Sequence, residues 1–163
     1  MVSRAHIDAA LADVPDPELP VSIVELGMVC GVDINGEDVD VKLVPTYTGC
    51  PALPMIEQDV RAKVTAVQGV ESCTVSWCYE PAWNPDRITE PGREKLRAHG
   101  VTTTGCCGGG QSTVELTTSA LACPYCGSSD TRLDSAFGPT RCRSIYFCDG
   151  CRNQFEHIKP VTS

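Results

Sequence analysis

The sequence has little positive charge and no long apolar run, and each absence excludes a class of function. Thirteen Lys and Arg residues stand against 21 Asp and Glu residues, so the 163-residue chain carries a net charge of −8. Binding to nucleic acid or to an anionic membrane needs clustered Lys and Arg. No stretch has the roughly 20 apolar residues of a membrane span, and "MVSRAHIDAALADV" lacks the apolar core of a signal peptide. We therefore expect a cytoplasmic protein that binds neither nucleic acid nor membrane.

Cysteine, in contrast, is abundant. The chain contains 11 cysteines, an odd number, and seven of them lie at or after Cys106. Without an export signal, cysteines at this density more often bind metal or do thiol chemistry than form disulfides. Their uneven distribution indicates a C-terminal module that differs from the rest of the chain.

Residues 1–100 are predicted to form an α/β domain. Apolar residues recur at helical spacing from Ile7 to Val14 and again from Ile56 to Val67, which predicts two amphipathic helices. A third, short helix is expected to end just before Gly100, because glycine is favoured immediately after a helix.

Alternation of apolar and polar residues predicts a three-stranded sheet in this domain, with strands over residues 28–34, 39–43 and 73–79. The pair Asn35-Gly36 is typical of a tight hairpin and predicts that the first two strands are adjacent. The alternation also predicts one buried face of the first strand, formed by Met28, Cys30, Val32 and Ile34.

The remaining chain divides by composition. Residues 101–119 are rich in Gly, Thr and Ser and are predicted to be a flexible linker. This linker contains the adjacent pair Cys106-Cys107, either incidental or an auxiliary redox or metal-binding pair. Residues 120–163 form the C-terminal module.

Two Cys-x-x-Cys turns in the C-terminal module give the strongest signal in the sequence. They are separated by 21 residues, enough for a hairpin that brings four thiolates into one tetrahedral shell. A module of about 40 residues buries too little apolar surface to fold without such a staple. We predict a structural zinc ribbon, although a rubredoxin-like iron site uses the same geometry. The four ligands are Cys123, Cys126, Cys148 and Cys151.

A fifth cysteine of the module, Cys142, lies in "TRCRSIYFC". Free cysteines are usually buried, so we expect Cys142 to be a buried residue beside the metal. The alternative is exchange with a metal ligand during metal transfer. Ribbons of this type also bind nucleic acid, but here acidic residues offset most of the arginines.

Cys50, in "LVPTYTGCPALP", lies between a predicted strand and a predicted helix. Prolines after it suit a first helical turn, which places Cys50 at or near the N-terminus of that helix. Free backbone N–H groups and the helix dipole would there favour the thiolate. On these residues alone, a reactive thiol and a space-filling side chain are equally good interpretations. No histidine lies near Cys50 in the sequence to act as a base.

Two carboxylates, Asp16 and Glu18, lie between prolines in "DPELPVSIVELGMV". They could contact a metal or a partner, or cap the helical turn expected at residues 22–26.

Three segments carry a resemblance to known proteins. "DPELPVSIVELGMV", "VKLVPTYTGCPA" and "VESCTVSW" resemble the iron–sulfur assembly domain family that includes SufT and the eukaryotic cytosolic cluster-targeting factors. With "YEPAWNPDRITEPGREKLRAHG" and the four-cysteine module, the chain resembles the PaaD family, the accessory proteins of phenylacetyl-CoA epoxidase systems. The resemblance covers nearly the whole chain except residues 101–119.

The resemblance implies a non-catalytic maturation factor for an iron-dependent oxygenase. It places the family's reactive cysteine on Cys50, its acidic turn on Asp16 and Glu18, and implies a transient iron or iron–sulfur cluster at Cys50. The client would be the oxygenase reductase or its di-iron subunit. Because one thiolate cannot hold a cluster, a homodimer or a client complex is expected. The alternatives are an adaptor subunit, an enzyme with a nucleophilic Cys50, and a nucleic-acid-binding ribbon.

Overall fold

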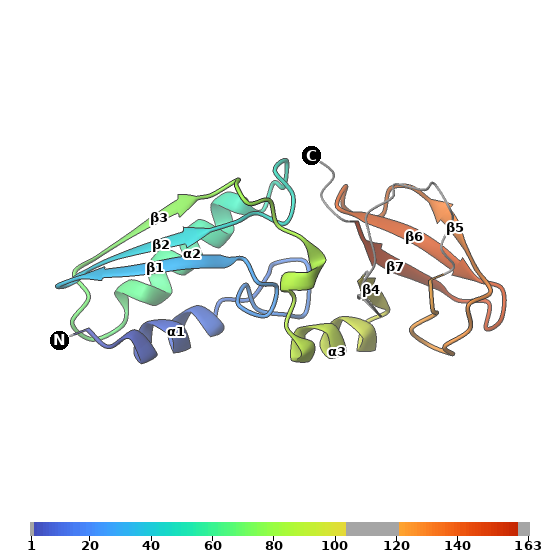
Figure 1. Ribbon diagram of the computed structural model, residues 1–163, viewed down its shortest axis with the longest axis horizontal. Coiled ribbons are helices and arrows are strands. Elements are labelled where there is room, and N and C mark those ends of the chain that lie inside the picture. Colours follow the sequence, from blue (N-terminus) through green and yellow to red (C-terminus); the bar gives the residue numbers. More distant parts are fainter. Residues whose placement is uncertain (1, 104–120, 160–163) are drawn as a thin grey trace.

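The structure, a computed structural model, describes residues 2–103 and 121–159. The molecule is elongated, with one sheet at each end and the third helix between the two sheets (Figure 1). Each sheet belongs to one of the two modules expected from the sequence.

The N-terminal sheet has three strands, β1 (Val29–Asn35), β2 (Asp38–Leu43) and β3 (Ser72–Trp77), in the order β1-β2-β3. β1 and β2 pair antiparallel, whereas β2 and β3 pair parallel. A parallel pair needs a crossover connection, and here helix α2 (Leu53–Thr65) supplies it. The crossover determines where Cys50 lies, between the end of β2 and the start of α2.

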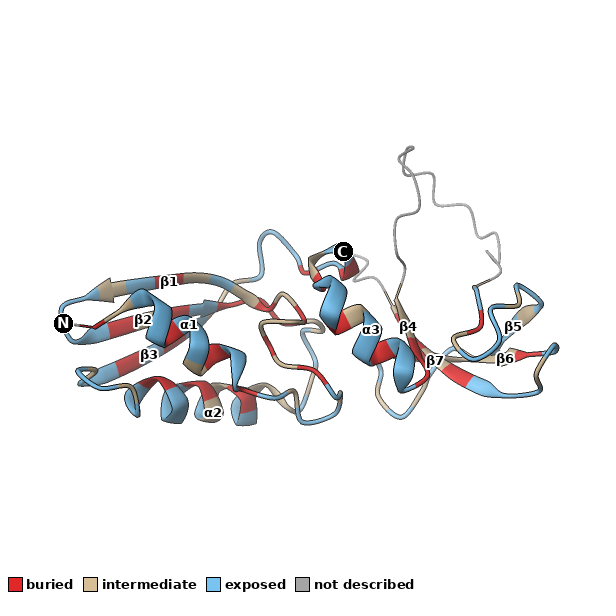
Figure 2. Ribbon diagram, turned by 90° about the horizontal axis from the view of Figure 1, so that it is seen from below, coloured by how far each residue is buried: buried red, intermediate tan, exposed pale blue. Residues whose placement is uncertain are grey.

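Helices α1 (Arg4–Ala12) and α2 lie on the same side of this sheet (Figure 2). No described helix, in residues 2–103 or 121–159, is long and apolar enough to cross a membrane. The helices and the facing side of the strands bury apolar residues at the predicted spacing, which confirms the periodicity in the sequence. These buried residues are Ile7, Leu11, Val32, Val39, Val41, Leu43, Ile56, Val60, Val64 and Val75.

Two residues of the predicted buried face are not fully buried: Ile34 is partly buried, and Cys30 departs further. Cys30 is exposed, although Met28 and Val32 on either side of it are buried. The register between β1 and β2 shifts between Val29 and Gly31. A β-bulge at this point inserts one extra residue, so strict alternation no longer assigns Cys30 to the core face.

The segment between α1 and β1 packs against the chain that follows β3. The indole Nε1 of the fully buried Trp83 donates to the carbonyl of Leu26 at 2.8 Å. Gly27 follows with a φ of +68°, and a Cβ placed there would lie 2.3 Å from the carbonyl oxygen of Arg87. Glycine is therefore needed at position 27 for both its backbone conformation and its close approach.

The third helix joins the two modules. A short 3₁₀ helix, η1 (Pro85–Arg87), leads into α3 (Glu90–Ala98). The Thr89 side chain accepts a hydrogen bond from the backbone N–H of Gly92, and Gly100 follows the helix with a φ of +72°. The helix predicted to end before Gly100 is thus confirmed.

The C-terminal sheet has four strands, β4 (Val101–Thr103), β5 (Thr131–Ser135), β6 (Arg143–Cys148) and β7 (Gln154–Ile158), in the order β4-β7-β6-β5. The assignment of residues 101–103 to a linker was wrong, because they pair in parallel with β7. The Gly, Thr and Ser-rich composition did not indicate a strand, because β4 forms only by pairing with β7, which is distant in the sequence. Cys106 and Cys107, with the rest of residues 104–119, lie outside the described residues.

The two modules share apolar core. Val101 of β4 and Ile158 of β7 are both buried in the cluster that fills the N-terminal domain. His157, in β7, is also buried and lies 3.0 Å from the hydroxyl of Thr102. Burial lowers the pKa of this imidazole to about 4, so it is neutral at neutral pH. The ribbon is docked on the domain rather than tethered to it.

Two glycine substitutions test the close approach at position 27. Gly36, in the β1–β2 loop, has a φ of +71°, but a Cβ added there would meet nothing within 4 Å. Gly36→Ala should therefore cost only the left-handed backbone strain, about 1–2 kcal/mol. Gly27→Ala adds a clash with the Arg87 backbone and should cost a further 1–3 kcal/mol or so. Urea unfolding measures both, and equal losses would contradict the contact.

Candidate metal centre and thiol cavity

Four cysteines of the ribbon converge at one point. The sulfur atoms of Cys123, Cys126, Cys148 and Cys151 all lie within 4.8 Å of one another. The first pair precedes β5, whereas Cys148 ends β6 and Cys151 lies in the turn to β7, so the strands bring the two pairs together. The convergence predicted from spacing is confirmed.

The spacing of the sulfurs fits a tetrahedral metal. The Sγ atoms of Cys123 and Cys151, and those of Cys126 and Cys148, are each 3.6 Å apart. Four thiolates about 2.3 Å from a zinc ion would lie roughly 3.8 Å from one another. The backbone N–H of Asn153 donates to Cys151, and its side chain approaches the same sulfur at 3.5 Å, which lowers the pKa of that thiol to about 7.

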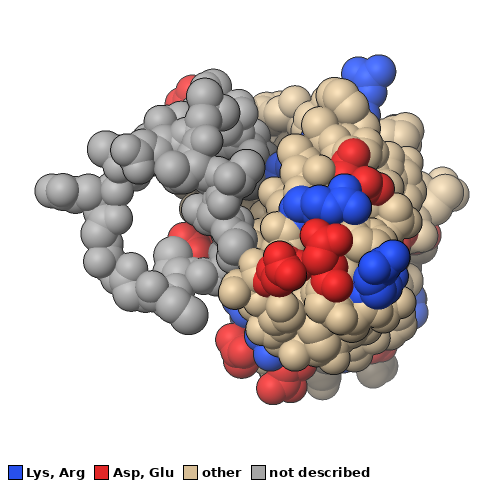
Figure 3. Space-filling model, turned by 90° about the vertical axis from the view of Figure 1, so that its right-hand side faces the viewer, with Lys and Arg blue, Asp and Glu red and all other residues tan. Residues whose placement is uncertain are grey.

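The outer face of the ribbon carries mixed charge (Figure 3). Arg132 forms ion pairs with Asp149 at 3.3 Å and with Asp134 at 3.7 Å. A phosphate-binding surface needs unpaired cations gathered on one face. This face therefore gives no support to a nucleic-acid-binding ribbon.

Cys50 lies just before α2, as expected. The N-cap of the helix is Ala52, two residues later, and Pro54 occupies its first turn. The backbone N–H of Cys50 donates to the carbonyl of Tyr47 at 3.2 Å, and its own carbonyl accepts from Leu53 at 3.4 Å. These two hydrogen bonds hold the backbone of Cys50 in the loop between β2 and α2, and the residue is partly buried.

The expectation that the helix N-terminus favours the Cys50 thiolate was wrong. Burial raises the pKa of this thiol, and the backbone N–H of Ala52, which donates to the sulfur, only partly offsets that effect. The negative charges of Glu18 and Asp16 raise the pKa further, as would a charge on Cys142. A low dielectric and like charge both favour the neutral thiol, and they outweigh the helix terminus.

Cys50 opens onto a cavity of about 370 Å³ that both modules line. Glu18, Tyr47 and Cys50 belong to the N-terminal domain, whereas Thr140 and Cys142 belong to the ribbon. Pro51, Gly49, Pro139 and Arg141 complete the lining, and no histidine is among the described residues that form it.

The expected place of Cys142 beside the ribbon metal was wrong. Cys142 immediately precedes β6, and Cys148 is the last residue of that strand. At 3.3 Å per residue, the two positions are about 20 Å apart along the strand. The alternation of "RCRSIYF" did predict a strand, but it could not show which end of the strand would hold the metal.

The acidic turn is built by Asp16. Its Oδ1 accepts hydrogen bonds from the backbone N–H groups of Glu18 and Leu19, at 2.8 and 2.9 Å. Burial raises the pKa of this carboxyl, although the two N–H groups act in the opposite direction. Glu18 is exposed and reaches the cavity of Cys50, whereas Asp16 is not part of its lining.

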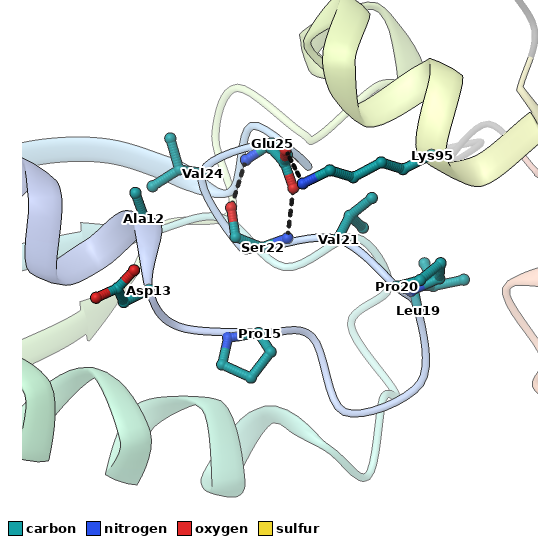
Figure 4. Close-up of a pocket in the computed structure, with 10 residues that line it drawn as sticks. All are labelled: Ala12, Asp13, Pro15, Leu19, Pro20, Val21, Ser22, Val24, Glu25 and Lys95. Atoms are coloured by element: carbon teal, nitrogen blue, oxygen red, sulfur yellow. Dashed lines mark hydrogen bonds and ion pairs between the residues drawn. The ribbon is translucent and has the colours of Figure 1, made fainter. Parts of the chain in front are cut away.

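The helical turn at residues 22–26 is capped by its own residues rather than by the acidic turn. The hydroxyl of Ser22 accepts from the backbone of Glu25, and the carboxylate of Glu25 accepts from the backbone of Ser22 (Figure 4). This reciprocal pair is a capping box. The Nζ of Lys95, in α3, forms an ion pair with Oε1 of Glu25 at 2.6 Å and lowers the pKa of the Glu25 carboxyl.

Arg143 is the site residue that sequence reasoning missed. It is only 7% exposed, and its guanidinium contacts Glu156 of β7, Thr140 at 2.9 Å, and Glu18 at 3.8 Å. A buried arginine is rare unless it is paired. No local pattern could have found it, because Glu18 lies more than a hundred residues away in the chain.

Comparison with known proteins gives two family matches. A family model described as iron-sulfur cluster assembly protein matches residues 4–77, and one described as PaaD zinc beta ribbon domain matches residues 108–159. The chain is 38% identical to a protein of Escherichia coli whose name makes it a subunit of a "Putative 1,2-phenylacetyl-CoA epoxidase". The match covers 96% of this chain and 92% of that protein.

Relatives of the N-terminal domain alone are also found. A Porphyromonas gingivalis protein named Fe-S protein maturation auxiliary factor is 40% identical over 49% of this chain and 77% of its own length. The crystal structure of a Bacillus anthracis domain, titled as a domain of unknown function, superposes with a TM-score of 0.53 at 30% identity. It covers 55% of this chain and 87% of that domain.

The raised pKa of Cys50 predicts slow alkylation. In iodoacetamide labelling followed by peptide mass spectrometry, the rate at Cys50 should still be rising above the pH at which an ordinary thiol is half ionised. Glu18→Gln should move this midpoint to lower pH, because it removes a nearby negative charge. Glu37→Gln, in the exposed β1–β2 loop, is the control and should change nothing. A midpoint below that of an ordinary thiol would contradict the burial.

Loss of one ribbon cysteine should unfold the ribbon selectively. Cys126 is exposed, so Cys126→Ser changes little apart from the ligand set. Amide exchange in β6 should then lose at least about 3 kcal/mol of protection, because metal binding supplies most of the folding energy of such modules. Amides of β2 should remain protected, and Cys30→Ser, at another exposed thiol, should behave as wild type. Full protection of β6 in Cys126→Ser would show that the ribbon needs no metal.

Proposed function

The chain belongs to the iron-sulfur cluster assembly protein family and carries a PaaD zinc beta ribbon domain, and from this membership we propose that it is a maturation factor for an iron-dependent oxygenase. It would receive iron or an iron–sulfur cluster at Cys50 and pass it to a component of the oxygenase. In this proposal the metal is cargo, and the protein itself catalyses no step of the oxygenation.

The observation that carries the proposal is the position of Cys50 in the cavity. Its thiol lines a space of about 370 Å³ together with the carboxylate-bearing Glu18. Thiolates are the preferred ligands of iron–sulfur clusters, and carboxylates suit iron ions. The loop that presents Cys50 lies between a strand and a helix of a packed domain, so the thiol is held in place.

The ribbon supports this role structurally. We assign zinc to Cys123, Cys126, Cys148 and Cys151, because four closely placed thiolates form a closed tetrahedral site. The bound metal would hold the two turns of the ribbon together. Without it the small cluster around Phe155 would be the main core of that module.

Nucleophilic catalysis by Cys50 fits the site poorly. A cysteine nucleophile needs a lowered pKa or a nearby base, whereas the pKa of Cys50 is raised. None of the described cavity-lining residues is a histidine. A non-catalytic role is supported by the names of two relatives that match the N-terminal domain, one a maturation auxiliary factor and the other an iron-sulfur cluster carrier protein.

The client is inferred from the Escherichia coli relative, whose name makes it a subunit of an epoxidase. We propose that the recipient is the di-iron subunit or the iron–sulfur reductase of such a system. The cargo would need further ligands, from the client or from a second copy of the chain.

A second candidate function is an adaptor subunit that contributes contacts only. The word "subunit" in the name of the relative favours it. Co-purification with the oxygenase at a fixed ratio throughout turnover, with no iron on this chain, would support the adaptor over the maturation factor.

Metal and sulfide analysis after anaerobic purification tests the proposal. Wild type should contain one zinc per chain and should take up iron and sulfide on reconstitution. Cys50→Ser should keep the zinc and lose the iron and sulfide, and Cys126→Ser should lose the zinc. Cys73→Ser, at a thiol that lies outside the cavity lining, is the control for loss of a thiol. Retention of iron and sulfide by Cys50→Ser would rule out Cys50 as the cargo site.

A further inference from the structure

The cavity of Cys50 contains a second thiol. Cys142 lines the same cavity, although 92 positions separate the two cysteines and they belong to different modules. The two thiols are close enough for the charge of one to act on the other. Neither the N-terminal domain nor the ribbon presents this pair by itself, because docking of the modules creates it.

Cys142 is held in place by its neighbours. Its sulfur lies 3.1 Å from the hydroxyl of Thr140, and its carbonyl accepts a hydrogen bond from the backbone N–H of Lys159 at 2.9 Å. It stands at the opposite end of β6 from Cys148, so it is too distant to exchange with the ribbon metal. Its partial burial is explained by the cavity and not by the ribbon core.

The adjacent residue fixes the two sides of the cavity relative to each other. Arg143 donates to Thr140 and Glu156 within the ribbon and lies 3.8 Å from Glu18 of the N-terminal domain. Glu18 is itself part of the cavity lining. Cys142 therefore lies next to Arg143, whose contact with Glu18 joins the ribbon to the N-terminal domain.

We propose that Cys50 and Cys142 together form a second metal site, separate from the four-cysteine site, that binds a thiophilic cation such as iron. Glu18, on the same cavity, contributes a negative charge that favours a cation there. Each thiol releases its proton to solvent as the cation binds, and no group is oxidised or reduced. The site rests on the proposed function, for which it would be the place where the cargo is held.

Two protein thiolates leave other coordination positions of the metal open. A closed structural site has four protein ligands, whereas a site with open positions accepts ligands from outside. A client could therefore bind the same metal before this chain releases it. Transfer would require only that the client's thiolates replace Cys50 and Cys142 in turn.

Cobalt titration tests the pair directly, because Co²⁺ bound by thiolates absorbs in the near ultraviolet in proportion to the number of sulfurs. The full chain is loaded with zinc in the ribbon and carries Cys106→Ser and Cys107→Ser, to remove the thiols outside the described residues. One further Co²⁺ should bind per chain. Cys50→Ser and Cys142→Ser should each halve the charge-transfer absorbance and weaken Co²⁺ binding at least tenfold.

Cys30→Ser is the matched control, because Cys30 and Cys78 form another pair of neighbouring thiols. It should leave the Co²⁺ titration unchanged. Cys142→Ala should repeat the result of Cys142→Ser, and amide exchange in β6 verifies that both variants fold. Equal cobalt absorbance in wild type and in both Cys142 variants would overturn the proposal.

The outcome separates this site from the proposed function. If Cys142→Ser loses the cobalt bands but the wild type takes up no iron and sulfide, the two-thiol site stands and the maturation role fails. If Cys142→Ser keeps the bands and Cys50→Ser alone loses iron and sulfide, the two-thiol site fails and the maturation role stands.

Discussion

The contact on which the arrangement of this molecule most depends is the buried guanidinium of Arg143. It lies between Glu156 of the ribbon and Glu18 of the N-terminal domain, with both carboxylates partly exposed. Removing Glu156 would leave the buried guanidinium without its close partner and costs about 3–5 kcal/mol. The contact to Glu18, which is longer at 3.8 Å and partly exposed, contributes about 0–1 kcal/mol. Val101 and Ile158 add apolar burial across the same junction, worth roughly 1.5–3 kcal/mol each. The ribbon is therefore held in one orientation, and the cavity between the modules is a consequence of that orientation.

Within this cavity the chemistry of Cys50 is set by a competition. A helix N-terminus favours a negative charge by about 0.3–1 kcal/mol at an exposed site. Burial and the charges of Glu18 and Asp16 act in the opposite direction and prevail, so the pKa of Cys50 is raised. A neutral thiol resists alkylation and oxidation, since the thiolate is the reactive form. A cation in the cavity would reverse the balance, because a metal lowers the pKa of its thiol ligand. The thiol would then ionise only when cargo arrives.

Local sequence patterns predicted most helices and strands, but not the features that depend on contacts between segments distant in the sequence. Helical spacing located α1 and α2, alternation located β2 and β3, and cysteine spacing located the metal centre, because each depends on residues close in sequence. The bulge that exposes Cys30 was missed, since it is set by pairing with β2. β4 was missed because its partner, β7, lies about fifty residues further on. The second thiol of the cavity depends on docking of the modules, which no local pattern encodes.

The central claim is that Cys50 carries metal cargo to an oxygenase component, and a transfer assay tests it most directly. The reconstituted chain is mixed anaerobically with the apo form of the iron–sulfur reductase, and recovery of electron transfer by the reductase is followed over time. Wild type should restore the reductase faster than the same concentration of free iron and sulfide. Cys50→Ser, folded and with zinc in its ribbon, should give no more than the rate of free iron and sulfide. Equal restoration by wild type and Cys50→Ser would contradict the account.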